Sequence, residues 1–256
     1  MLKEIVIAIQ SYFDAHRFIR RHRLWKWILI PGLIYTLLFV VSMYFFGKSA
    51  NNVIEWILNV THVNAWLHQF NNALLSFLFV FAAAILWLVL MLFYFSLFKY
   101  VWLIVGSPVF AYLSEKTEAI IEERDYPFSM AQLIKDTLRG IAIALRNTLW
   151  QTVYTVSILI LSLVPVVGWI TPLIALLIEC YYYGFSMLDY SCERRQMTAA
   201  ESIYYIGNHK GLAIGNGMVF YLMHILPIIG WVLAPAYAVV AATLSMIEIK
   251  GKQVVV

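Results

Sequence analysis

Charged residues are scarce in this chain of 256 residues, and their scarcity excludes a soluble domain. Only 12% of the residues are Asp, Glu, Lys or Arg, and 62% are hydrophobic, whereas soluble proteins carry about 25% charged residues. The longest fairly polar stretch, residues 106–146, has too few apolar side chains to build a core of its own. We therefore predict a single all-helical integral membrane domain over residues 1–256.

Cysteine and the residue patterns of enzymes are also sparse. The two cysteines, Cys180 and Cys192, define no disulfide framework. The sequence contains no His-Glu-x-x-His pair, no phosphate-binding loop and no nucleophile elbow, and His62 and His68 lack the spacing of metal ligands. Five acidic residues within 115–125 have helical spacing, and we expect them to form a solvated face. The sequence thus predicts no enzyme, metal, cofactor or nucleic-acid partner.

One pattern, Pro-x-x-Gly-Trp followed by a further proline, occurs twice. Its hinge residues are Pro165, Gly168 and Pro172 in the first copy and Pro227, Gly230 and Pro235 in the second. Each copy is flanked by apolar arms of roughly 13 to 17 residues, which reach about 20 to 25 Å against a hydrocarbon core of about 30 Å. We predict two half-penetrating, re-entrant hairpins, at residues 149–190 and 211–249. Because broken helices in a bilayer need protein or a water-filled cavity beside them, the pair suggests a homo-oligomer, a pathway, or both.

Two longer apolar segments, residues 24–46 and 73–105, are predicted to span the membrane. Five lysines and arginines precede the first segment and a sixth cation, Lys26, lies at its start, whereas only Lys48 lies between the two segments, so the N-terminus is expected in the cytoplasm. The later connections and the C-terminus also carry cations, which places both ends of each hairpin on that side. Charge parity equally allows four full spans in place of the hairpins, and only the short arms favour the shallower arrangement.

Amphipathic helices are predicted at the membrane surface. Residues 1–23 form a basic interfacial helix, with Ile5, Ile9, Tyr12 and Phe13 on one side, and anionic lipid headgroups are expected to attract its basic end. Residues 107–148 form cytoplasmic or interfacial helices. The second of these begins at a capping box, Ser129-x-x-Gln132, and leads into the first hairpin.

A basic cluster, Arg20, Arg21, Arg23 and Lys26, stands where the first span enters the bilayer. Guanidinium and ammonium groups at such a position attract a tetrahedral anion and can hold it with charge-assisted hydrogen bonds. The alternative is an ordinary positively charged flank of a membrane span. Both interpretations remain open from the sequence.

Two further sites contain polar groups at membrane depth, where charge and polarity are costly. Glu179 lies seven residues past Pro172 and should face protein or water; its partner could be a tyrosine hydroxyl from residues 181–183 or an arginine, and a functional role is equally open. The second is Gly215-Asn216-Gly217, at the entrance of the second hairpin. Its glycines favour close helix packing, and its backbone N–H groups could instead form an anion-binding nest.

The chain resembles the CysZ and etoposide-induced-protein family. The resemblance rests on the second hairpin from Gly217 to Pro235, on the Ala-Ala-Thr243 that follows it, and on Leu188-Asp189-Tyr190, Ser107-Pro108 and Leu29-Ile30-Pro31. Where the bacterial sulfate proteins of the family carry Gly-Leu-Arg-Arg, this chain has Arg23-Leu24-Trp25-Lys26. One cation is therefore kept as Lys26, and Arg23 takes the place of the glycine.

The resemblance implies an oligomeric protein of the bacterial inner membrane, with two long spans and two pairs of half-penetrating helices, linked to sulfate uptake. We accordingly expect a multi-pass permease or channel for an inorganic anion, most simply sulfate, with both termini in the cytoplasm. The cluster from Arg20 to Lys26 would gather the anion, and residues 215–217 would line part of its route. The alternative is a non-transporting membrane scaffold, as in the etoposide-induced-protein branch.

Overall fold

The computed structural model describes residues 1–60, 94, 98, 101, 103–123, 130–162, 170–226 and 228–254, and the regular elements in these ranges are all α-helices. The chain divides into two compact units, Met1–Thr36 with Lys99–Val256, and Leu37–Phe98. Three parts of the prediction lie outside the described residues: the connection from residue 61 to 72 between the two predicted spans, most of the predicted span 73–105, and the hinge residues Pro165, Gly168 and Pro227.

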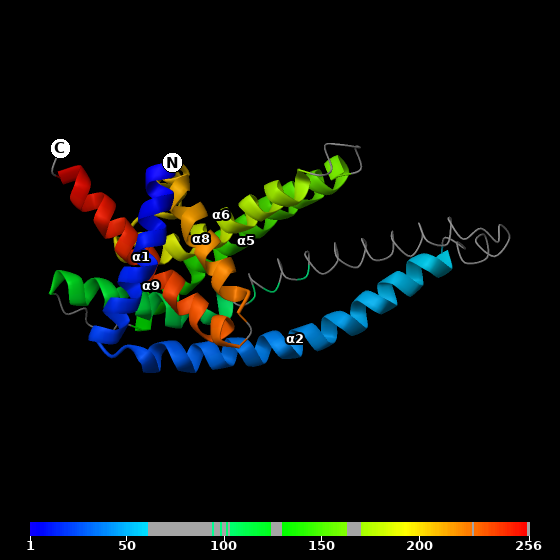
Figure 1. The fold of residues 1–256 in the computed structure, drawn as a ribbon, viewed down its shortest axis with the longest axis horizontal. Coiled ribbons are helices and arrows are strands. Elements are labelled where there is room, and N and C mark those ends of the chain that lie inside the picture. The colour runs from blue at the N-terminus through cyan, green and yellow to red at the C-terminus, as the bar shows by residue number, and fades with distance from the viewer. Residues whose placement is uncertain are drawn as a thin grey trace. The chain divides into compact units, whose positions relative to one another are not determined.

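The first unit is built around four contacting helices, α1 (Leu2–Arg21), α6 (Thr171–Arg194), α8 (Lys210–His224) and α9 (Ile229–Val254) (Figure 1). Helix α1 lies against α8 and α9 through small and aromatic side chains: Ala8, Ser11, Tyr12, Ala15 and Ile19 are buried. The predicted apolar side fits only in part, because Tyr12 is buried whereas Phe13 is 68% exposed. An amphipathic pattern shows that a helix has an apolar face, but it does not distinguish a lipid neighbour from a protein one.

Glycines allow α8 to approach its neighbours closely. A Cβ atom on Gly217 would lie 2.0 Å from the carbonyl oxygen of Cys180 in α6, and one on Gly184 would lie 1.9 Å from that of Ala213 in α8. On the opposite side, a Cβ atom on Gly215 would lie 2.8 Å from that of Ala8 in α1. None of these positions can accept a larger residue unless the helices move apart.

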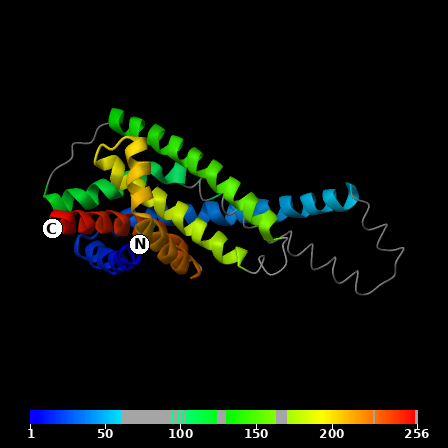
Figure 2. The ribbon, with the colours of Figure 1, turned by 90° about the horizontal axis from the view of Figure 1, so that it is seen from above.

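Helix α5 (Met130–Ser162) joins the predicted surface helix and the first hairpin arm into one element of 33 residues. It runs beside α6, the second arm, as both views show (Figure 2). Helix α6 continues through Leu188-Asp189-Tyr190, so these residues are helical and do not form a turn. The short helix α7 (Ala199–Asn208) then connects the hairpins; it begins at a capping box in which Thr198 and Glu201 exchange hydrogen bonds.

Three of the described helical segments are long and apolar enough to cross a membrane: Trp25–Asn52, Thr171–Arg194 and Ile229–Gly251. The first lies in α2 (Trp25–Val60) and overlaps the predicted span 24–46. The other two contain hairpin arms and are longer than the 13 to 17 residues expected from the sequence. Helix length alone therefore does not separate half-penetrating hairpins from full crossings.

In the second unit, two aromatic residues from 73–105 pack along α2. The Tyr94 hydroxyl donates to the carbonyl oxygen of Ser42 at 2.6 Å, and its ring lies 4.8 Å from that of Phe46. One turn before Ser42 in α2, the ring of Phe39 lies 5.6 Å from that of Phe98. The contacted positions in α2 thus fall from 42 and 46 to 39 as the residue number rises from 94 to 98, so the two contacts follow an antiparallel order.

Candidate functional site

The basic cluster lies on a tight turn between α1 and α2. The N–H of Leu24 donates to the carbonyl oxygen of Ile19 at 3.1 Å, across six residues, and both side chains are buried. Arg23, between them, has φ of 54°, in the left-handed region that favours glycine. This is the geometry of a Schellman motif, in which glycine usually takes the position that Arg23 holds here.

The turn leaves Arg20, Arg21, Arg23 and Lys26 exposed. Among the described residues, none of the four forms an ion pair with a carboxylate. Arg20 and Arg21 occupy the last turn of α1, where the negative end of the helix dipole favours cations. Arg23 and Lys26 follow within five residues, so the structure brings the whole predicted cluster to one helix junction.

Residues 215–217 lie in the interior of α8, which begins at Lys210. Their N–H groups therefore fall within the helical hydrogen-bond ladder and do not form a nest at a helix N-terminus. Asn216 is fully buried. Its Nδ2 donates to the carbonyl oxygen of Ala238 at 2.9 Å, and its backbone carbonyl oxygen accepts from the Tyr12 hydroxyl at 2.8 Å. These contacts match the close-packing alternative, and they place the segment in the interface of three helices.

The described hinge residues differ in their surroundings. Pro172 is exposed at the start of α6, whereas Pro235 is buried inside α9. At the second tip, a Cβ atom on Gly230 would lie 1.8 Å from the carbonyl oxygen of Met223. The indole N–H of Trp231 donates to the carbonyl oxygen of His224 at 3.1 Å, so the Gly-Trp pair closes the second tip against the end of α8.

Glu179 is half-buried and joins both hairpins. Its carboxylate accepts from the Tyr221 hydroxyl at 2.9 Å and from the side-chain amide of Gln151. Gln151 lies in α5, Glu179 in α6 and Tyr221 in α8. A tyrosine partner was among the expected alternatives, but it comes from α8 and not from residues 181–183.

A buried ion-pair network, which the sequence did not reveal, lies at the other end of α6. Arg139 in α5 forms two hydrogen bonds with Asp189, at 3.0 and 3.2 Å, a third with the Ser202 hydroxyl, and a longer ion pair with Glu193 at 3.6 Å. The side chains of Arg139, Asp189 and Glu193 are only 15, 6 and 3% exposed. The fork of the guanidinium thus links α5, α6 and α7.

The network continues to residues 103–122, which are helical. Arg194 pairs with Glu115 at 2.9 Å, and Arg195 pairs with Glu118 at 3.3 Å. Glu118 is only 5% exposed, so the expectation that the acidic run forms a solvated face is wrong for this residue and for Glu115. Their partners are 77 and 79 residues away in sequence, which is why helical spacing alone did not reveal them.

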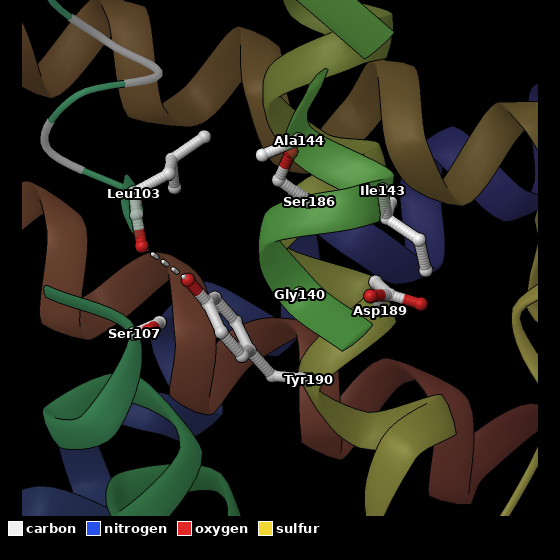
Figure 3. A pocket seen from close by; sticks show the side chains of 8 residues that line it. All are labelled: Leu103, Ser107, Gly140, Ile143, Ala144, Ser186, Asp189 and Tyr190. Atoms are coloured by element: carbon white, nitrogen blue, oxygen red, sulfur yellow. Dashed lines mark hydrogen bonds between the residues drawn. The ribbon is translucent and has the colours of Figure 1, made fainter. Parts of the chain in front are cut away.

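A small cavity of about 20 Å³ borders this network (Figure 3). Ser107, Ser186, Asp189 and Tyr190 contribute polar groups to its lining, and the Tyr190 hydroxyl donates to the carbonyl oxygen of Leu103 at 3.1 Å. This volume accommodates about one water molecule. In the described residues, no group of three or more His, Cys, Asp or Glu side chains is placed to hold a metal ion.

The family comparison covers the basic turn, the first hairpin and the second hairpin as far as Pro235. Residues 11–235 match the model of the family described as Sulfate transporter CysZ/Etoposide-induced protein 2.4. The chain belongs to this family. Its membership agrees with the expectation of a membrane transporter rather than an enzyme.

Several relatives are named sulfate transporter CysZ. The chain is 27% identical to the one from Pseudomonas aeruginosa PAO1 over 246 residues, which is 95% of each protein. It is 27% identical to that of Pseudomonas syringae pv. tomato over 237 residues, covering 88% of this chain and 89% of the relative. It is 28% identical to that of Pseudomonas fluorescens Pf-5 over 150 residues, covering 58% of this chain and 60% of the relative. Full-length similarity thus supports an inorganic-anion transport family.

Proposed function

We propose that this protein is an oligomeric permease or channel of the bacterial inner membrane that conducts an inorganic anion, with sulfate as the leading candidate. The observation that carries the proposal is the exposed basic turn at the entrance to a candidate span, because its four cations have no carboxylate partner among the described residues. The names of the relatives support sulfate as the anion.

The turn suits the capture of a tetrahedral oxyanion. Guanidinium groups donate two parallel hydrogen bonds to such an anion, and several nearby cations raise its local concentration. Arg23 and Lys26 flank the buried Leu24, which anchors the turn. We therefore assign these two residues the direct contacts and Arg20 and Arg21 the attraction of the anion.

The proposed membrane arrangement places both termini in the cytoplasm and both hairpin tips within the bilayer. Exposed apolar residues around the tips support this arrangement: Ile170, Leu173 and Leu177 in the first hairpin, and Ile225 and Ile229 in the second, are 49 to 72% exposed. Such surfaces are suited to lipid or to another subunit.

The decisive experiment measures uptake of labelled sulfate by the purified protein in liposomes. Replacing Arg23 and Lys26 together with glutamine removes two charge-assisted contacts, each worth about 1.5 to 3 kcal/mol, so the affinity should fall roughly a hundredfold or more. The matched control replaces Lys3 and Lys250, which are exposed and carry the same charge; its affinity should stay at the parent value. Unchanged affinity in the first variant would exclude this site. Absence of flux in the parent protein would favour the non-transporting scaffold.

A single substitution separates charge from backbone geometry at the turn. Arg23→Gly removes the cation but suits the left-handed backbone, so the turn should form at least as readily as in the parent. Sulfate affinity should still fall by roughly tenfold or more. A glycine variant with parent affinity would show that Arg23 does not contact the anion.

Cysteine labelling tests the membrane arrangement. On a background that lacks Cys180 and Cys192, single cysteines at Asn52 and Ala200 should react with an impermeant reagent from opposite sides. Ala200 is exposed and avoids Thr198, whose side chain caps α7. Cysteines at the exposed tip residues Ile170 and Ile229 should not react from the outer side; if either reacts there, that hairpin crosses the membrane.

A further inference from the structure

An open hollow of about 470 Å³ lies between α5, α6 and the first turn of α8. Two cations, Arg146 of α5 and Lys210 of α8, contribute to its lining, together with the aromatic residues Trp150, Tyr154 and Tyr182. No Asp or Glu is among the lining residues. A hollow that combines cations with large apolar and aromatic surfaces is suited to an amphipathic, negatively charged molecule.

No carboxylate of the described residues forms an ion pair with Arg146. Its guanidinium donates to the Oδ1 of Asn147 at 2.9 Å and lies 5.9 Å from the centre of the Phe185 ring. Among the described residues, neither Arg146 nor Lys210 forms an ion pair with an acid. Arg139, two turns earlier in the same helix, pairs with Asp189 and Glu193, so Arg146 differs from the structural arginine of α5.

The remaining walls of the hollow are those expected near the headgroup region of a bilayer. Trp150 and Tyr154 are 49 and 44% exposed, and their rings lie 6.3 Å apart; such aromatic residues favour the membrane–water interface. Ile174, Leu177 and Ile178 continue the lining along α6, toward the exposed apolar tip of the first hairpin. The hollow thus grades from cationic to apolar along the arms of this hairpin.

We propose that this hollow binds one anionic phospholipid. Arg146 and Lys210 hold its phosphate from two sides, and an acyl chain lies along Ile174, Leu177 and Ile178. A free inorganic anion would satisfy the cations but leave the apolar wall uncovered. A zwitterionic phospholipid would bring a quaternary ammonium group beside Arg146 and Lys210, so its headgroup would supply no net negative charge to the hollow. The site is separate in sequence from the basic turn and does not depend on the proposed sulfate transport.

The test is lipid retention by the full-length protein, measured by native mass spectrometry after extraction from vesicles of phosphatidylglycerol and phosphatidylcholine in equal amounts. The parent should retain one phosphatidylglycerol per chain. Arg146→Gln with Lys210→Gln should lower this retention at least tenfold, whereas the control variant Lys3→Gln with Lys250→Gln should retain the lipid. Retention that is unchanged in the first variant, or equal for the two lipids, would overturn the proposal.

A second variant keeps both cations and fills the hollow. Ile214 is part of the lining, and Ile214→Trp should exclude the lipid while leaving sulfate affinity unchanged. This variant tests the lipid site even if the double glutamine variant does not fold. Undiminished retention in Ile214→Trp would contradict the site. Displacement of the lipid by added sodium sulfate would identify the hollow as an inorganic-anion site and would likewise overturn the proposal.

Discussion

The two hairpins carry the same Pro-x-x-Gly-Trp sequence but lie in different surroundings. In α9, the C-terminal arm of the second hairpin, 78% of the most apolar stretch is buried. In α6, the C-terminal arm of the first, the buried share is 50%. Exposure in the second hairpin is concentrated around its tip, where Leu222, Ile225 and Ile229 lie, and α9 is almost continuously buried from Val232 to Met246. In the first hairpin, exposed apolar residues extend over both arms, from Leu149 to Leu161 and from Ile170 to Leu177.

This difference shows that the surroundings of each copy depend on the side chains of the flanking helices and not on the repeated motif. The second hairpin has small residues along its arms, such as Gly215, Gly217, Ala238 and Ala242, which allow neighbouring helices to approach. Large aliphatic side chains dominate the parts of the first hairpin near its tip, whereas α6 from Cys180 onward is largely buried and contacts α8 and α9. We therefore regard the second hairpin and this part of α6 as the core of the unit, and the tip half of the first hairpin as its lipid-facing or subunit-facing surface.

The largest expected effect comes from breaking the buried ion pairs of Arg139, which link α5 to α6. Arg139→Ala leaves the buried Asp189 without its guanidinium partner, and we expect the free energy of unfolding in detergent to fall by about 3 to 5 kcal/mol. Arg139→Lys keeps the charge but loses the fork, so its loss should be smaller. If Arg139→Ala lowers the free energy of unfolding by less than the exposed control Arg17→Ala does, packing rather than charge holds α5 against α6 at this point.

Glycine substitutions compare a packed helix face with an open one. Gly217→Ala in α8 forces a Cβ atom against the backbone of Cys180 and should cost about 1 to 3 kcal/mol of stability. Gly140→Ala in α5 meets no atom within 4 Å and should be neutral or stabilising by up to about 1 kcal/mol. Thermal unfolding of both variants measures the contrast, and equal effects would refute the distinction between the packed face of α8 and the open position in α5.

The link between the hairpins is tested at Tyr221. Tyr221→Phe removes the hydroxyl that donates to Glu179, and a hydrogen bond to a charged group is worth about 1.5 to 3 kcal/mol, so a loss near the lower value is expected for this half-buried pair. Tyr44→Phe is the control, because Tyr44 is 70% exposed. If both variants unfold at the same temperature, Glu179 does not join the hairpins energetically.

The smallest effect is expected in the connecting helix α7. The backbone N–H and hydroxyl of Thr198 lower the pKa of Glu201, so this capping box stabilises the fold above the ordinary pKa of glutamate and is lost as the pH falls through the lowered value. Thr198→Ala should raise the pKa of Glu201 toward its ordinary value, which NMR titration measures. The backbone N–H of residue 198 is kept in this variant, so a pKa that does not move would show that the Thr198 hydroxyl contributes nothing to the lowered value.

The all-helical class and the membrane-transporter family were predictable from the sequence, because long apolar runs and local motifs are readable without the fold. The partners of α1 were not, since its pattern of small residues does not reveal that α8 presents glycines opposite Ala8. Nor were the ion pairs of Glu115 and Glu118, whose arginines are far away in sequence. The basic cluster was found because adjacent cations form a local signal, but the left-handed backbone of Arg23 required the structure.

The contacts of α1 also have a consequence for biosynthesis. Among the described helices, α1 leaves the ribosome before the others, and its buried face lies against α8 and α9, which come after the rest. About 200 residues must therefore be synthesised before the Tyr12 hydroxyl can reach Asn216, 204 positions later, and closing so long a loop is slow. Until then the face formed by Ala8, Ser11 and Ala15 lacks these partners, and a nascent chain that stops before Lys210 would present it to lipid or to a chaperone.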